Sequence, residues 1–160
     1  MARQICFLAL TLCLASPALA TSNCDQLETY QQNAEQGNSD AQFELASLYS
    51  HGKCGLEQNL ALAVALYHKA AEQGDRYAQY NLGVHYSKGL GTEANQKTAA
   101  MWFLKAAEQE DVDAQFNIGI RYVYGNGVDE NTPLAIQWLK KAKQQGHKDA
   151  PQVLRQLGEI

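Results

Sequence analysis

The residues with the spacing of a catalytic motif are Ser50 and Lys53, which form the pattern Ser-x-x-Lys. In penicillin-recognising enzymes this pattern supplies a serine that becomes acylated, and it is accompanied by the sequences Ser-Asp-Asn and Lys-Thr-Gly. Neither companion occurs in the chain, and the pattern falls where a helix is predicted to end. We therefore interpret these residues as a boundary between structural elements.

Histidine is the next candidate for chemistry. The four histidines are spread over different predicted elements: His51, His68, His85 and His147. No two of them have the i, i+4 spacing with a carboxylate that helical zinc sites use. The Gly-x-Gly sequences at residues 89–91 and 125–127 lack the third glycine and the preceding strand of a phosphate-binding loop. The sequence therefore predicts no catalytic residue, no metal and no cofactor, and hence a protein that is not an enzyme.

The elements that carry these residues repeat along the chain with a period of 36 or 37 residues. Four alanines mark the repeat, at Ala41, Ala78, Ala114 and Ala150. Tyrosines and glycines follow the same spacing, at Tyr49, Tyr86, Tyr122, Gly52, Gly89 and Gly125. Repeats of this length are typical of solenoids, in which each unit packs against its neighbours.

Each unit is predicted to contain a first helix, a glycine loop and a second helix. Ala78, Leu82 and Tyr86 lie at i, i+4 and i+8, so they share one helix face. A small residue follows the leucine or isoleucine of each first helix and allows a second helix to approach closely: Ala46, Gly83 and Gly119. An asparagine stands where each second helix should begin and can cap its free N–H groups: Asn59, Asn95 and Asn131.

These patterns predict an all-α solenoid of helix pairs in one domain over residues 21–160. Its expected parts are an N-terminal capping helix at 22–36, repeats at 38–74, 75–110 and 111–146, and a C-terminal capping helix at 149–158. Gly74 and Gly146 are expected to end second helices. The corresponding residue in the middle repeat is Glu110, so that turn must close without glycine.

The first twenty residues are expected to be a secretory signal peptide, outside the fold. Arg3 precedes an apolar run at residues 5–15, and Ala18-Leu19-Ala20 has the small-x-small pattern of a cleavage site. The run is too short to span a bilayer, so no membrane insertion is expected. Cleavage near Ala20 would place the mature protein in the periplasm or outside the cell.

The net charge of the mature chain, and the distribution of its basic residues, limit the kinds of partner that it is expected to bind. Removal of Arg3 with the signal leaves 12 basic and 17 acidic residues, a net charge of 12 − 17 = −5. The basic residues are scattered, which argues against nucleic acid and anionic lipid as partners. The expected partner is therefore another protein. The chain itself is expected to be a monomer.

Two cysteines remain after signal cleavage, Cys24 and Cys54. Cys24 begins a helix that should run antiparallel to the helix over residues 41–50, and Cys54 follows the end of that helix. Both should therefore lie at the same end of a helix pair, within reach of each other. An exported chain enters an oxidising compartment, so we predict a disulfide between them.

The repeats resemble the Sel1-like repeat family, slightly longer relatives of tetratricopeptide repeats. The third repeat carries the family pattern most fully, at Ala114, Ile118, Gly119, Tyr122, Gly125, Gly127, Val128, Trp138, Lys141, Ala142 and Gly146. The second has Thr92 in place of valine and Glu110 in place of glycine. The first departs most, with Ala46 in place of glycine and Leu66 in place of tryptophan.

The resemblance implies a right-handed α-solenoid of antiparallel helix pairs that acts as an adaptor for other proteins. Exported members include cysteine-rich bacterial proteins whose helix pairs are stapled by disulfides. Two alternatives stay open at this point. One is an immunity or inhibitor protein that neutralises an exported toxin or enzyme. The other is the penicillin-binding or β-lactamase-like activity proposed for some cysteine-rich relatives.

By analogy with tetratricopeptide repeats, the first helices should line a concave surface that binds the partner. The candidate residues are Phe43, His51, Tyr77, Tyr80, Val84, Lys88, Phe116, Ile120 and Tyr124. The recurrence of an aromatic residue at positions 43, 80 and 116 also fits packing between helices, so both interpretations remain for those three. Tyr77, His51 and Tyr124 differ between repeats and are the better candidates for recognition.

Overall fold

Eight helices make up the part of the chain that the computed structural model describes, residues 24–159. They are α1 (Leu27–Glu35), α2 (Ser39–His51), α3 (Leu60–Glu72), α4 (Arg76–Lys88), α5 (Gln96–Glu108), α6 (Val112–Tyr124), α7 (Thr132–Gln144) and α8 (Ala150–Gln156). No strand occurs among these residues. The fold is all-α, as the repeat predicts.

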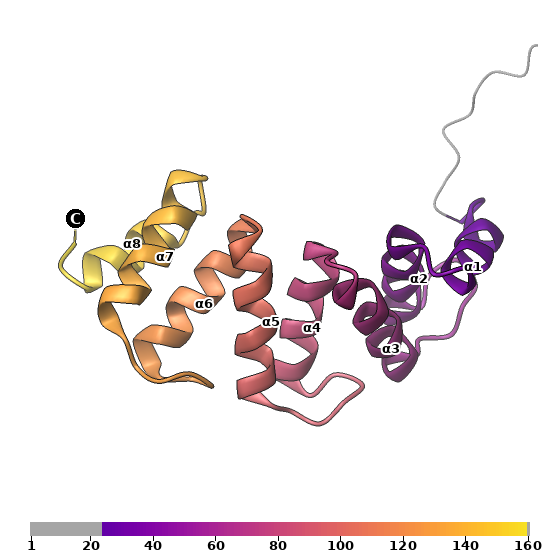
Figure 1. Ribbon diagram of the computed structural model, residues 1–160, viewed down its shortest axis with the longest axis horizontal. Coiled ribbons are helices and arrows are strands. Elements are labelled where there is room, and N and C mark those ends of the chain that lie inside the picture. The colour runs from indigo at the N-terminus through magenta and orange to yellow at the C-terminus, as the bar shows by residue number, and fades with distance from the viewer. Residues whose placement is uncertain (1–23, 160) are drawn as a thin grey trace, which may run out of the picture.

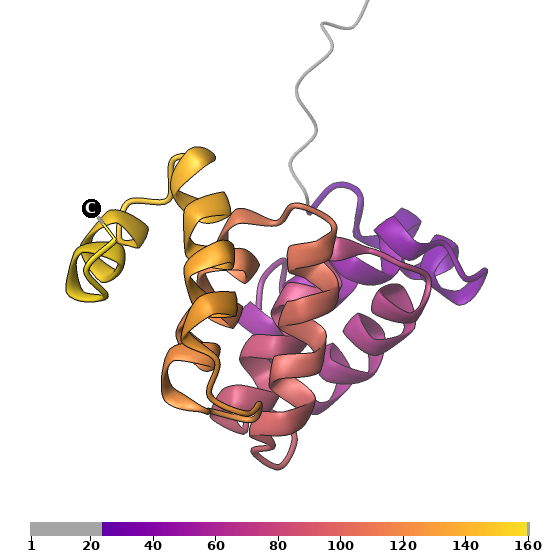
Figure 2. The ribbon, with the colours of Figure 1, turned by 60° about the vertical axis from the view of Figure 1, so that its left-hand side comes forward.

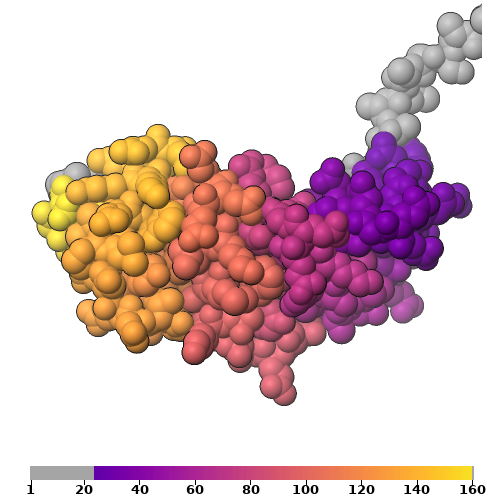
Figure 3. Space-filling model, viewed as in Figure 1, coloured from indigo at the N-terminus to yellow at the C-terminus, as the bar shows by residue number. Residues whose placement is uncertain are grey.

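The helices are stacked in the order of the sequence. Each packs chiefly against the helix before it and the helix after it. Figure 1 shows α1 at one end of the long axis and α8 at the other, and Figure 2 shows the same succession after a turn of the view. In the space-filling view the colours follow one another in bands along the molecule (Figure 3). This is the α-solenoid that the sequence predicts.

Polar side chains begin the helices of every repeat. The asparagines predicted to cap the second helices do so, because the side-chain oxygens of Asn59, Asn95 and Asn131 accept hydrogen bonds from the backbone N–H groups of Leu62, Thr98 and Leu134. The first helices are capped in the same way by Asn38, Asp75 and Asp111. Each cap satisfies an N–H group that the helix itself leaves free.

Close packing within each helix pair depends on the small residue in the first helix. A Cβ atom placed on Gly83 would lie 2.7 Å from the ring of Phe103, and one on Gly119 would lie 2.9 Å from Cγ of Leu139. Ala46 holds the same position in the first repeat and is fully buried. The prediction that a small residue permits close helix approach is confirmed.

The turn without glycine closes as expected. Glu110 adopts a left-handed backbone conformation with φ 64°, where the other two repeats use Gly74 at φ 96° and Gly146 at φ 88°. Such a conformation is uncommon for a residue with a side chain. The turn at Glu110 therefore carries local backbone strain, which a glycine at this position would avoid.

The two ends of the solenoid are covered by short helices. α1 begins at Leu27, after a turn at residues 24–26, and α8 ends at Gln156, so both are shorter than the ranges expected from the sequence. The predicted signal peptide at residues 1–20 lies outside the described residues. Within the described part of the chain, no helix has the length and apolar character needed to cross a membrane.

Cys24 and Cys54 form a disulfide, as predicted, and their Cα atoms are 4.9 Å apart. The bond joins the segment before α1 to the loop after α2. Cys54 lies in the loop that carries the extra residue, and its φ of 59° is left-handed. The inserted residue thus gives the loop the bend that brings the two sulfur atoms together.

Candidate functional site

The nine candidate residues lie on the first helices α2, α4 and α6, and we call the surface they form the first-helix face. It consists of Phe43, His51, Tyr77, Tyr80, Val84, Lys88, Phe116, Ile120 and Tyr124. On α4, Tyr77, Tyr80, Val84 and Lys88 follow one another at helical spacing and so share one side of the helix. The distance along the axis from Tyr77 to Lys88 is about 16 Å. The face therefore has two ends, which differ in composition.

Aromatic side chains meet at the end of this face where the helices begin. The ring of Phe43 lies 5.9 Å from that of Tyr67 on α3 and 5.9 Å from that of Tyr77 on α4. Phe43 is half-buried and packs against the core, whereas 49% of Tyr77 is exposed. Phe43 thus supports the exposed ring of Tyr77 from behind.

Tyr80 lies on α4, like Tyr77, and is the residue of the second repeat that is equivalent to Phe43. Its ring contacts Phe103 edge-on with centroids 5.7 Å apart, so it packs against the core of the second helix pair. Burial raises the pKa of Tyr80, and the carboxylates of Asp113 and Asp111 raise it further. Asp111 caps α6 and Asp113 lies in its first turn, so the start of α6 is close to the phenol of Tyr80. Tyr80 accordingly contributes packing between helices as well as surface.

Phe116 stacks flat on the imidazole of His147, with centroids 4.0 Å apart and planes inclined by 14°. The backbone N–H of Asp149 donates to Nδ1 of His147 over 3.2 Å, so Nε2 carries the proton of the neutral ring. That nitrogen lies 3.6 Å from a carboxylate oxygen of Asp113. The packing of Phe43, Tyr80 and Phe116 fits the structural interpretation of their recurrence, and each also borders the exposed surface.

Tyr77 is held by the side chain before it. The guanidinium of Arg76 lies 4.7 Å from the centre of the Tyr77 ring, and its Nη2 donates a hydrogen bond of 2.7 Å to the phenol oxygen. Arg76 also donates to the backbone oxygen of Gln109 over 3.5 Å. A hollow of about 300 Å³ adjoins this pair, lined by Arg76, Tyr77, Glu110, Asp111, Val112, Asp113 and Gln145. The surface here combines an aromatic ring with charges of both signs.

The remaining candidates lie at the other end of the helices. His51, Lys88 and Tyr124 are the last residues of α2, α4 and α6, and all three are exposed, Tyr124 to 71%. Nδ1 of His51 lies 2.8 Å from the backbone oxygen of Ser47. The half-buried Val84 and Ile120 lie between the two ends. The structure therefore brings the rings of Phe43 and Tyr77 together but separates them from His51 and Tyr124 along the helices.

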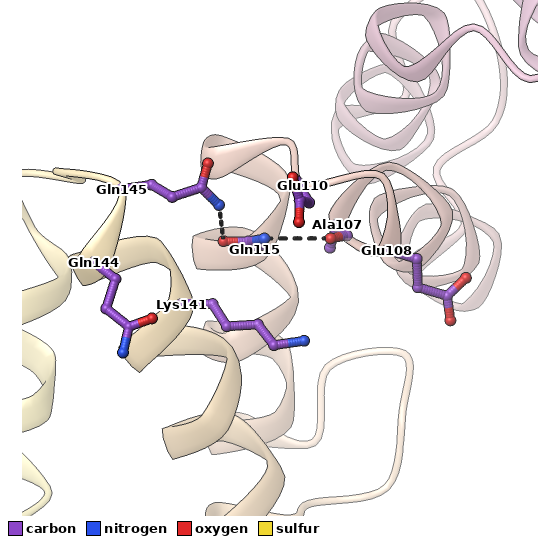
Figure 4. A pocket seen from close by; sticks show the side chains of 7 residues that line it. All are labelled: Ala107, Glu108, Glu110, Gln115, Lys141, Gln144 and Gln145. Carbon is purple, nitrogen blue, oxygen red and sulfur yellow. Dashed lines mark hydrogen bonds between the residues drawn. The ribbon is translucent and has the colours of Figure 1, made fainter.

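Sequence reasoning missed a ladder of buried glutamines that joins the repeats. Gln42, Gln79 and Gln115 each donate to a backbone oxygen near the end of the preceding second helix, on Ala34, Ala71 and Ala107. Each side-chain oxygen in turn accepts from the glutamine after the following second helix, namely Gln73, Gln109 and Gln145. Figure 4 shows the last rung, in which Gln145 reaches Gln115 and Gln115 reaches Ala107.

The signal for this ladder is present in the sequence. Glutamine follows alanine at the start of each first helix, and a second glutamine stands before the turn that closes each repeat. Carbonyl groups at the end of a helix lack partners within it, and buried polar groups are nearly always hydrogen-bonded. Recurrence of an amide side chain at both positions therefore predicts the bonds. The ladder thus ties each first helix to the second helix before it and to the turn after the second helix of its own repeat.

Polar side chains are also buried at one position of the first helices in the second and third repeats, where the first repeat has a leucine. Leu48, His85 and Arg121 are equivalent, and all three are less than a tenth exposed. Nδ1 of His85 lies 2.8 Å from the backbone oxygen of Leu90, and burial lowers the pKa of His85. Burial also lowers the pKa of Arg121. The sequence did not predict the burial of His85 and Arg121, because histidine and arginine side chains are usually at least partly exposed.

The Ser-x-x-Lys pattern lies at the wrong end of a helix for acylation. Ser50 is the second-last residue of α2, and Gly52 ends that helix in a left-handed conformation. The backbone oxygen of Ser50 accepts a hydrogen bond from Gln58 over 3.0 Å. Within residues 24–159, no group of three or more His, Cys, Asp and Glu side chains is placed to hold a metal ion. A polar hollow of about 490 Å³ between α5, α6 and α7 is the one drawn in Figure 4, and its acidic and basic side chains are Glu108, Glu110 and Lys141.

The fold and this surface define a helical-repeat solenoid. The model of the Sel1 repeat family matches residues 39–75, 76–111 and 112–147. The chain therefore belongs to the Sel1 repeat family. Proteins of this family are helical-repeat scaffolds, typically without enzymatic activity, and generally take part in protein–protein interaction.

Solved structures with the same repeats are similar over most of this chain. A Sel1 repeat protein from Oxalobacter formigenes is 36% identical over 85% of the chain, with a TM-score of 0.78. The protective antigen c5321 of uropathogenic Escherichia coli strains, which displays an SLR fold, is 36% identical over 78% of the chain, with a TM-score of 0.74. The chain spans only 39% and 27% of these two chains.

A third structure shares the fold. Helicobacter pylori cysteine rich protein B is 22% identical over 84% of this chain and 99% of its own, with a TM-score of 0.61. A comparison with curated proteins finds no match.

Proposed function

We propose that this chain is an exported scaffold that binds a partner protein through the first-helix face. The observation that carries the proposal is the exposure of Tyr77, whose ring rests against the half-buried ring of Phe43. Large aromatic side chains are costly to leave in water, and a tyrosine with an apolar body and a polar tip is typical of binding surfaces. Tyr124, at the other end of the face, is exposed in the same way.

The surroundings of Tyr77 indicate what the partner offers. Arg76 and the carboxylates of Asp111 and Asp113 surround a shallow hollow beside the ring. An apolar side chain of the partner can cover the ring while polar groups beside it pair with these charges. A helix or an extended segment laid across α2, α4 and α6 would reach all three repeats at once.

Export is the second part of the proposal. The disulfide between Cys24 and Cys54 is of the kind that persists in oxidising compartments. The N-terminal sequence has the pattern of a secretory signal. Together these features support a location in the periplasm or outside the cell. We propose further that the chain acts there as a monomer.

Capture of the partner from a periplasmic extract tests the proposal. Immobilised protein should retain a specific partner, and the double variant Tyr77→Ala, Tyr124→Ala should lose it. The triple variant with Tyr80→Ala should show the same loss, provided its circular dichroism is unchanged. Met101→Ala is the matched control, because Met101 is 44% exposed on α5, away from the face. Equal capture by the double variant and the control would show that the face is wrongly assigned.

The identity of the captured protein also separates the adaptor from its alternatives. A captured toxin or enzyme that loses activity on binding identifies an immunity or inhibitor protein that uses the same surface. A penicillin-recognising activity would appear as covalent labelling by a fluorescent penicillin that is lost in Ser50→Ala. The position of Ser50 at the end of α2 leads us to expect no such labelling.

A further inference from the structure

One position in the second helices differs between the repeats in a way that leaves space. Leu66, Trp102 and Trp138 are equivalent, at intervals of 36 residues in α3, α5 and α7. All three are buried. The first repeat thus has an aliphatic side chain where the other two have an indole.

In the second and third repeats the indole fills the space between successive second helices. Trp102 belongs to a core cluster with residues of α3 and α4, and Trp138 to a cluster with residues of α5 and α6. A lysine lies over each ring, with Nζ of Lys105 4.3 Å from the centre of Trp102 and Nζ of Lys141 4.2 Å from that of Trp138. Each indole is therefore buried on its neighbours and faced by a cation.

In the first repeat the residues that would surround an indole at this position are present, but the indole itself is replaced by Leu66. A hollow of about 430 Å³ lies between α1, α2 and α3, in the size range of about 300–1,000 Å³ that small organic groups occupy. Ala34 and Leu45 line it, and they are equivalent to Ala71 and Leu82 in the cluster around Trp102. Lys69 also lines it, at the position of Lys105 and Lys141.

The hollow is open and mainly apolar. Leu62, Leu66 and Tyr49 supply most of its remaining wall, and 37% of Leu62 is exposed. Gln31 and Glu35 lie at the same hollow and offer oxygen atoms to an indole N–H. An exposed leucine beside an unfilled apolar space is favourable for burial by a partner.

We propose that this hollow binds a tryptophan side chain presented by a partner protein. The occupant is inferred from the equivalent positions in the second and third repeats. There an indole packs against equivalent apolar residues of the preceding helices, and the lysine equivalent to Lys69 lies over its ring. The site is separate from the first-helix face, because Phe43 and Leu45 are two residues apart on α2 and so point about 200° apart around the helix. The inference therefore does not rest on the proposed function.

Titration of the full chain with N-acetyl-L-tryptophanamide tests this site. Ligand-detected NMR should show saturable binding, and amide resonances of residues around Leu62 and Leu66 should shift. Leu66→Trp puts the missing ring into the hollow, so it should weaken binding by at least about tenfold and raise the thermal midpoint. Met101→Trp adds an indole to an exposed position on α5 and should change neither quantity.

Two further variants keep the test decisive if Leu66→Trp fails to fold. Lys69→Met removes the cation over the ring and should weaken binding about two- to fivefold. Leu62→Glu places a charge at the rim and should abolish binding while the circular dichroism stays unchanged. Absence of saturable binding to the wild-type chain would overturn the proposal, as would unchanged binding in both variants. Binding of free indole without binding of N-acetyl-L-tryptophanamide would also overturn it, because the site would then accept a small metabolite and not a side chain.

Discussion

Nη2 of Arg121 on α6 donates a hydrogen bond of 2.8 Å to the hydroxyl of Ser87 on α4. Its Nη1 donates to the side-chain oxygen of Gln96 over 3.1 Å and to the backbone oxygen of Asn126 over 3.1 Å. The guanidinium also lies 5.0 Å from the centre of the Phe103 ring. One buried cation thus joins the second repeat to the loop of the third through neutral oxygen acceptors.

We therefore expect Arg121→Ala to destabilise the protein by about 1–3 kcal/mol, because these partly buried acceptors lose their donor. Urea unfolding followed by circular dichroism measures this change. Arg155→Ala is the control, since Arg155 is exposed on α8. A loss of stability no larger than that of the control would show that the bonds of Arg121 contribute nothing net.

The buried His85 should make stability depend on pH. Burial lowers the pKa of His85 in the folded protein below the unfolded value of about 6.5. The unfolded chain then binds more protons as the pH falls below about 6.5, so the contribution of His85 to stability is lost in that direction. The free energy of unfolding should fall between about pH 7.5 and pH 5.5.

His85→Leu isolates this effect, because Leu48 fills the equivalent position in the first repeat. The difference between wild type and variant in the free energy of unfolding should change with pH. A constant difference across the range would contradict a neutral, buried His85.

The disulfide should supply a large part of the stability of the first repeat. It closes a loop with a sequence separation of 30 residues, which in the chain-entropy description stabilises the fold by about 3–4 kcal/mol. Reduction, or the double variant Cys24→Ser, Cys54→Ser, should lower the free energy of unfolding by about this amount. If the protein is exported as proposed, mass spectrometry of the periplasmic material should find no alkylatable thiol before reduction. Two free thiols in that sample would contradict the bond.

The glutamine ladder predicts a cost for breaking one rung. In Gln115→Leu the backbone oxygen of Ala107 keeps only the hydrogen bond from the backbone N–H of Glu110, and the amide of Gln145 loses its acceptor. We therefore expect a destabilisation of about 1–3 kcal/mol. Gln144→Leu is a matched control, because Gln144 is exposed on α7 beside the same hollow. Equal stability of the two variants would show that water replaces the lost bonds.

The repeat makes most of the fold predictable from the sequence. The helix pairs, the asparagine caps, the close approach at Gly83 and the disulfide of Cys24 all follow from residue type at fixed spacing. Each is a local rule, or a rule about which faces must pack. The helix ends were less well defined, because the turn at residues 24–26 depends on contacts that a single sequence does not reveal.

The site was predictable only in part. Spacing placed Tyr77 and Tyr80 on one side of α4, but it did not show that Phe43 and Tyr77 touch or that Phe116 stacks on His147. Those contacts depend on how far one repeat is rotated against the next. Arg121 was unpredictable for a further reason, since its acceptors are mostly backbone and amide oxygens that carry no charge pattern in the sequence.

The disulfide at one end of the stack has a mechanical consequence. The two ends of the chain would resist force unequally, because a covalent bond holds the segment before α1 to the loop after α2, whereas α8 is held by non-covalent contacts. These are the burial of Ala150 and Leu154 and the ion pair of Lys140 with Glu159. Under tension the solenoid should unfold from α8 toward the N-terminal end, one helix pair at a time. Single-molecule pulling would record a series of extension steps, and the segment enclosed by the disulfide would lengthen only after reduction.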